Sequence, residues 1–82
     1  MKVYVLIFND IVDESVDVDL YKDFESVKQA FDRILRTIRS CHTDDPEWVV
    51  ELEYMPEHES LYLRTKEDYE VFTRIKHIAT EG

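Results

Sequence analysis

The sequence predicts an α+β fold in which two ββα units form a four-stranded antiparallel sheet with two helices packed on one face. Its 82 residues, 44% of them hydrophobic, with one Gly and two Pro, suffice for one compact core. Several short segments alternate apolar and polar residues, as strands do, and others repeat apolar residues at helical spacing. We therefore expect a single domain over residues 1–82.

An internal similarity supports the two units. Residues 14–18 (ESVDV) resemble residues 59–63 (ESLYL), and residues 23–25 (DFE) resemble residues 68–70 (DYE). We interpret this as a pseudo-repeat comprising residues 1–42 and 46–82, each with the order strand, strand, helix.

The first unit begins with two predicted strands. Residues 2–9 are apolar at nearly every position, as in a central strand covered on both faces. In residues 15–21, Val16 and Val18 alternate with Asp17 and Asp19, which predicts one buried side and one acidic, exposed side.

A helix is predicted over residues 23–40, with Asp23 as its N-cap. Its apolar residues recur at steps of three and four and are Phe24, Val27, Phe31, Ile34 and Ile38.

The second unit repeats the order. Residues 48–54 and 61–64 alternate apolar and polar side chains and are predicted strands, with Pro56 in the turn between them. Residues 66–79 are predicted to be a second helix, because Thr65 and Asp68 match the start of a capping box and Tyr69, Phe72 and Ile75 share one stripe.

With both helices on one face, the other face of the sheet is open. We expect the alternating Val and Leu residues to point at the helices, although the continuous apolar run of the first strand leaves its orientation undecided. The predicted open face has an apolar, aromatic centre and a charged rim, as protein-binding surfaces do. The predicted partner-binding residues are Tyr4, Leu6, Phe8, Asp17, Asp19, Glu51, Glu53 and Tyr62.

The net charge of −9 favours positively charged partners and disfavours nucleic acid and anionic membranes. Residues 10–25 contain seven acids against one Lys, and residues 44–59 contain seven acids and no Lys or Arg. The same charge is also compatible with a role in solubility alone. Exposed aromatics on a four-stranded sheet can stack RNA bases, but these carboxylates would repel the phosphates.

Catalytic and metal-binding patterns are missing from the sequence, so we expect no enzyme activity, no cofactor and no metal. His42, Asp44 and Asp45 lie too close together in sequence for the four-point geometry of zinc. The acids of residues 10–19 lack the spacing and the glycine of a calcium loop. A small enzyme or metal protein using His42, His58 or the carboxylates would need polar groups converging in a pocket.

A cytoplasmic location is expected. Cys41 is the single cysteine, which rules out an internal disulfide and fits a reducing compartment. The longest apolar run, residues 3–8, is too short to cross a bilayer.

Two functional hypotheses follow. The first is a small acidic protein-binding module without catalysis that blocks a basic nucleic-acid-handling protein. In general profile the chain is similar to small acidic inhibitors such as nuclease immunity proteins, antitoxins and phage-encoded DNA mimics or anti-CRISPR proteins, although no motif assigns it to one of them. This profile is compatible with a phage or mobile-element protein. The second is a self-associating domain that forms a homodimer through the open face, or an adaptor.

Overall fold

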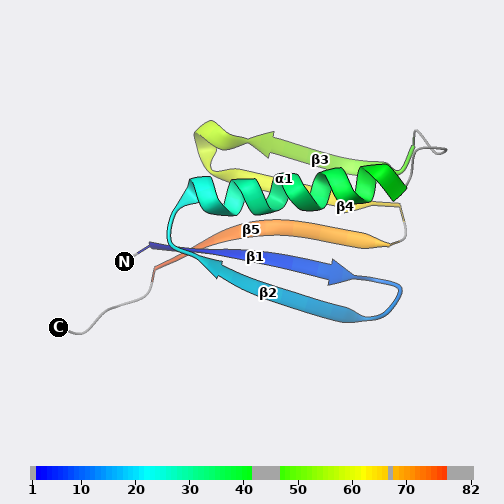
Figure 1. The fold of residues 1–82 in the computed structure, drawn as a ribbon, viewed down its shortest axis with the longest axis horizontal. Coiled ribbons are helices and arrows are strands. Elements are labelled where there is room, and N and C mark those ends of the chain that lie inside the picture. Colours follow the sequence, from blue (N-terminus) through cyan, green and yellow to red (C-terminus); the bar gives the residue numbers. More distant parts are fainter. Residues whose placement is uncertain (1, 42–46, 67, 78–82) are drawn as a thin grey trace.

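The computed structural model describes residues 2–41, 47–66 and 68–77. They form one helix and a five-stranded antiparallel sheet of order β2-β1-β5-β4-β3 (Figure 1). The elements are β1 (Lys2–Asp10), β2 (Ser15–Tyr21), α1 (Phe24–Cys41), β3 (Val49–Met55), a short 3-10 helix η1 (Pro56–His58), β4 (Ser60–Thr65) and β5 (Tyr69–His77). The α+β class is confirmed, whereas the prediction of four strands and two helices is wrong.

The predicted second helix is the strand β5, which lies at the centre of the sheet between β1 and β4. Its sequence fits both periods, because Tyr69, Phe72 and Ile75 form a helical stripe while Val71 and its neighbours also alternate with polar residues. Val71, which the helical stripe omits, is completely buried. The strand is favoured because it buries Val71 and because the backbone N–H and C=O groups of β1 and β4 that face it gain hydrogen-bond partners. A helix in the same place would leave those groups unpaired.

Thr65, expected to cap that helix, instead closes the turn between β4 and β5. Its hydroxyl donates a hydrogen bond to the carbonyl oxygen of Tyr69 (3.2 Å), and its oxygen accepts one from the backbone N–H of Tyr69 (2.8 Å). Thr65 is buried. A threonine is favoured in both places, because a helix start and a turn between strands each need a side-chain oxygen that accepts a hydrogen bond from a backbone N–H. Thr65 fills this role in the turn.

The helix α1 confirms its prediction. The carboxylate of Asp23 accepts a hydrogen bond from the backbone N–H of Ser26 (2.8 Å), which is the geometry of an N-cap. Val27, Phe31 and Ile38 are buried against the sheet. In Figure 1 the helix lies over one face of the sheet, and most of β2 lies beside the helix and not beneath it. Only the last residue of β2, Tyr21, packs against the core.

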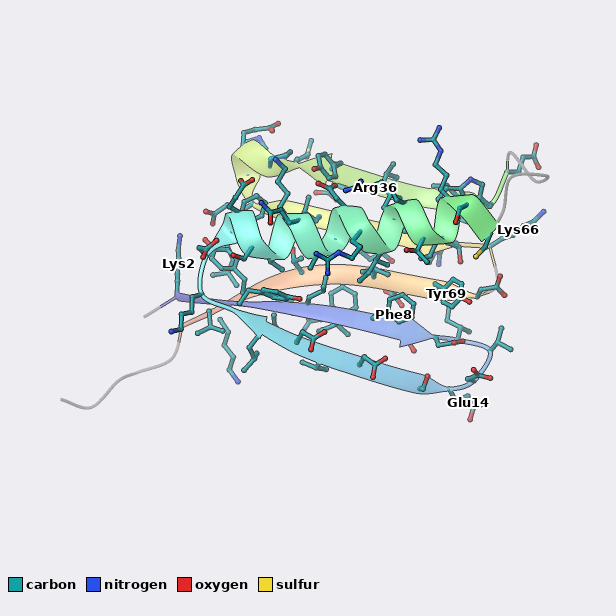
Figure 2. All side chains as sticks on the ribbon, viewed as in Figure 1. Lys2, Phe8, Glu14, Arg36, Lys66 and Tyr69 are labelled. Carbon is teal, nitrogen blue, oxygen red and sulfur yellow. The ribbon has the colours of Figure 1, made fainter. Side chains whose placement is uncertain are left out.

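The strand β1 has the orientation opposite to the one assumed for the predicted open face, a choice that its continuous apolar run leaves undecided. Tyr4 and Leu6 are 4% and 2% exposed and lie in the core beneath α1, where the Tyr4 ring meets Phe24 edge-on at 5.7 Å. Phe8 also packs against this core, 5.3 Å from the Tyr69 ring (Figure 2). A continuous apolar run has no period to fix its orientation, and here the larger side chains fill the space beneath the helix.

The orientation of β2 follows from that of β1. Phe8 pairs with Asp17 and Ile7 pairs with Val18, and paired residues of an antiparallel ladder share a face. Asp17 and Asp19 therefore lie on the helix side, while the apolar residues of β2 lie on the open face, the reverse of the prediction. The apolar alternation was expected to mark the core, but α1 reaches only part of the sheet.

The predicted orientation of the other hairpin matches the structure except at the start of β3, where Val49 and not Val50 packs against the core. Leu61 and Leu63 are buried beneath the helix. Glu51 pairs with Arg64 and Glu53 with Tyr62, on the open face. A register irregularity lies between Val49 and Glu51 in β3.

Candidate protein-binding surface

The open face carries an apolar patch at its β2 end. We define the β2 patch as Val5, Ile7, Val16, Val18 and Leu20. On β2, Val16, Val18 and Leu20 are 58%, 56% and 66% exposed, and the register places Val18 beside Ile7 and Leu20 beside Val5. The three β2 side chains are exposed, and Val5 and Ile7 are partly exposed, because the single helix covers the opposite face. Contiguous exposed apolar side chains of this kind mark interaction sites.

A shallow groove of about 470 Å³ runs along this patch. It is lined by Val3, Val5, Ile7, Val18, Leu20, Arg74, Ile75 and Lys76. On its β5 side the Arg74 guanidinium lies 5.2 Å from the centre of the Phe72 ring. The groove is thus apolar toward β2 and cationic toward the middle of the sheet.

The strand β2 is also an edge of the sheet. It pairs with β1 over seven consecutive residues without a register shift, and no strand of the described chain pairs with its outer side. An edge strand presents a row of unpaired backbone N–H and C=O groups. The other edge, β3, is interrupted by the irregularity between Val49 and Glu51.

The side of β2 that faces away from the patch is acidic. Asp17 and Asp19 are exposed and, with Phe8, Val18 and Ile34, line a second hollow of about 360 Å³ beside the helix. Neither carboxylate forms a hydrogen bond or an ion pair with another described residue. They remain available to pair with cations of a partner.

The loop between β1 and β2 extends this acidic surface. The Asp13 backbone N–H donates to the Asp10 carboxylate at 3.1 Å, and Glu14, at the tip of the hairpin in Figure 2, has the positive φ of 55°. Residues 3–21 contain five acids and no Lys or Arg. The hairpin is therefore uniformly negative, with an apolar face on one side of its edge strand.

The second predicted acidic group lies elsewhere. Glu51 and Glu53 belong to β3, four strand spacings from β2, or about 19 Å. Glu51 is 3.9 Å from the Arg64 guanidinium, and Glu53 accepts a hydrogen bond from the Ser60 hydroxyl at 2.6 Å. These two carboxylates already have partners within the chain.

The structure thus separates the eight predicted site residues into three locations. One group lies in or against the core, one on the acidic side of β2, and one at the β3–β4 end of the open face. The groups are Tyr4, Leu6 and Phe8; Asp17 and Asp19; and Glu51, Glu53 and Tyr62. The structure therefore does not bring the eight residues together on one surface.

Sequence reasoning missed the β2 patch. The alternation of Val16, Val18 and Leu20 was visible, but it was assigned to the core. No signal in the sequence revealed it, because the uncovered edge results from five strands spanned by one helix, and the fifth strand, β5, is predicted to be a helix.

Several buried tyrosines have raised pKa values, and the causes lie in the packing of the fold. Burial raises the pKa of Tyr4, Tyr54 and Tyr62 above 10.0, and a hydrogen bond from each hydroxyl to a carboxylate raises it further. The Tyr4 hydroxyl donates to Glu59 (2.9 Å). These hydroxyls stay protonated at neutral pH and stabilise the fold.

The metal-site hypothesis for His42, Asp44 and Asp45 falls on residues that lie outside the described part of the chain. Among the residues that are described, no group of three or more His, Cys, Asp or Glu side chains is arranged to hold a metal ion. In the same part of the chain, no helix has the length and apolar character needed to cross a membrane.

Comparisons with protein-family models, with curated proteins and with solved structures find no match to this chain. The functional assignment is therefore based on the geometry of the surface.

Proposed function

We propose that the chain is a protein-binding module without catalytic activity and that it binds a basic protein through β2. One observation carries this proposal: an edge strand has exposed apolar side chains on one face and, on the other, two carboxylates that have no partner among the described residues. The apolar side chains supply binding energy when they are removed from water. The carboxylates select a positively charged surface and accelerate association.

A nucleic-acid-handling protein is the partner class that this chemistry favours. Surfaces that hold nucleic acid are rich in Lys and Arg, which neutralise phosphates. The five carboxylates of residues 3–21 and the net charge of −9 offer such a surface an alternative anion. Binding there excludes nucleic acid, so the chain acts as an inhibitor.

The test is affinity capture from the native cell lysate at about 0.05 M and about 0.5 M salt, with mass spectrometry of the recovered proteins. The bait is compared with the variant Asp17→Lys/Asp19→Lys and with the control Glu53→Lys/Glu57→Lys. Each double change moves the net charge from −9 to −5, because each replacement adds two charges. Any difference between the variants is therefore due to the position of the charge.

We expect the wild-type bait and the control variant to capture a basic protein, and the variant Asp17→Lys/Asp19→Lys to fail to capture it. The captured protein should elute as the salt concentration rises. The recovered protein should then bind its nucleic acid less well when this chain is added. Equal capture by the two variants would show that Asp17 and Asp19 do not form the binding surface. Capture that resists high salt in every bait would contradict a charge-selected partner.

A homodimer is the second candidate, favoured by the exposed β2 patch. Stacking two open faces would remove Val16, Val18 and Leu20 of both copies from water. Light scattering over a range of concentrations tests it. A dimer that persists in high salt and is lost in Val18→Asp would support this candidate, and a monomer at all concentrations would reject it.

A further inference from the structure

We infer that the partner binds by adding a strand to the outer edge of β2 and that this strand alternates basic and apolar side chains. The inference rests on the proposed function and specifies its binding mode. Strand addition uses backbone hydrogen bonds for affinity and alternate side chains for specificity.

The β2 edge has the features that strand addition needs. Ser15–Tyr21 continues the sheet in regular register for seven residues, which is the length of an ordinary strand. It contains no Pro, no Lys and no bulge, three of the devices by which natural sheets block their edges. Its charged side chains are Asp17 and Asp19, which disfavour an acidic neighbour and favour a basic one. Among the described residues no strand covers this edge, so it can pair with a basic strand.

The two faces of β2 specify the side chains of the incoming strand. Residues opposite Asp17 and Asp19 lie on the helix side, where Lys or Arg forms opposite-charge cross-strand pairs. Residues opposite Val16, Val18 and Leu20 lie on the open face, where apolar side chains extend the β2 patch. A strand with this alternation satisfies both faces in one register.

A second copy of β2 is a poor occupant of the same edge. When two β2 strands pair antiparallel about a two-fold axis at Val18, Asp17 of one copy lies opposite Asp19 of the other, and the reverse. Shifting the axis by one residue in either direction places Asp17 opposite Asp17 or Asp19 opposite Asp19. Like charges directly opposite each other destabilise a strand pair, so the aspartates direct the edge toward a basic strand.

The β3 edge does not offer the same site. The irregularity between Val49 and Glu51 interrupts its regular register, and both of its central carboxylates have partners. This edge therefore serves as an internal control, because a strand that simply sought any free edge would bind there as well.

The test uses a seven-residue peptide, acetylated and amidated, in which lysine and valine alternate. It is titrated to about 1 mM into the isotope-labelled chain, and backbone amide shifts are followed by NMR. Three further peptides are compared: glutamate in place of lysine, N-methyl groups on the lysines only, and N-methyl groups on the valines only. In an added strand, the N–H groups of alternate residues point at the neighbour, so only one of the two methylated peptides is blocked.

We expect shifts along β2 and not β3, no binding of the glutamate peptide, and loss of binding for one methylated peptide alone. Asp17→Asn/Asp19→Asn should weaken binding about tenfold, while Glu53→Gln/Glu57→Gln, which removes the same charge, should have little effect.

Equal binding of both methylated peptides, or binding at β3, would overturn strand addition while leaving the proposed basic partner intact. No binding of the lysine peptide at all would also overturn it. The proposed function fails separately, through the lysate capture described above.

Discussion

Replacement of Val71 by alanine tests the central strand of the fold. Val71 is completely buried in β5, whereas a helix over residues 66–79 would leave it outside the buried stripe. Losing two buried carbon groups costs about 1.6 kcal/mol of transfer free energy. A residual cavity of roughly 40 Å³ adds about 1 kcal/mol, so the free energy of unfolding should fall by about 2.5 kcal/mol.

Val16→Ala is the matched control, because it makes the same chemical change in a strand whose valine is 58% exposed. Only the covered part of that side chain loses its transfer free energy, and no closed cavity forms. The expected loss is about 0.7 kcal/mol.

Urea unfolding measures both variants, with circular dichroism for the sheet and the fluorescence of the single tryptophan, Trp48, for the tertiary structure. The melting temperature should fall by roughly 10–20 °C for Val71→Ala. A loss for Val71→Ala no larger than that for Val16→Ala would refute the burial of β5 and, with it, the five-stranded sheet.

Three further predictions concern local features of the fold. Glu14→Gly should raise the melting temperature by a few degrees, because Glu14 has a φ of 55°, a conformation that costs a residue with a side chain about 1 kcal/mol; an unchanged or lower value in calorimetry would contradict this. Asp23 has a pKa lowered below 3.8, first by the hydrogen bond from the Ser26 backbone, so it stabilises the fold above pH 3.8 and this contribution is lost as the pH falls through the lowered pKa; melting curves of Asp23→Asn should therefore show a weaker pH dependence in this range than the wild type. Burial, as the largest cause, raises the pKa of four tyrosines above 10.0: Tyr4, Tyr54, Tyr62 and Tyr69. Their contribution to the free energy of unfolding should therefore be constant below pH 10 and should be lost as the pH rises through the raised pKa values. Ultraviolet titration should show these tyrosines ionising together with alkaline unfolding, and full ionisation near pH 10 in the folded state would contradict this prediction.

The sequence was sufficient for those elements whose pattern has one solution. The helix α1 has a single apolar stripe and a capping aspartate, Asp23, so its position followed directly. The β3–β4 hairpin alternates in both strands, and the burial of Leu61 and Leu63 agrees with that alternation.

The errors arose where local pattern has two solutions. The segment containing Val71 is compatible with both a helix and a strand, and only pairing with β1 and β4 decides between them. The run in β1 is apolar on both faces, so only the helix position selects Tyr4 and Leu6 for the core. Paired residues of β1 and β2 share a face, so the orientation of β1 also determines that of β2. One undecided orientation therefore led to two errors, because Asp17 lies on the helix side and the β2 patch lies on the open face.

The place of β5 in the sheet has a consequence for the order in which the molecule can assemble during translation. β1 and β5 pair along nine residues, and β5 is the strand that joins the β1–β2 hairpin to the β3–β4 hairpin. While residues 2–65 leave the ribosome, the inner sides of β1 and β4 have no neighbour in the sheet. Completion must wait for residue 77 and must close a long loop, which predicts folding in milliseconds to seconds after synthesis. Products of translation that stop before β5 would expose two additional sheet edges and should be prone to aggregation.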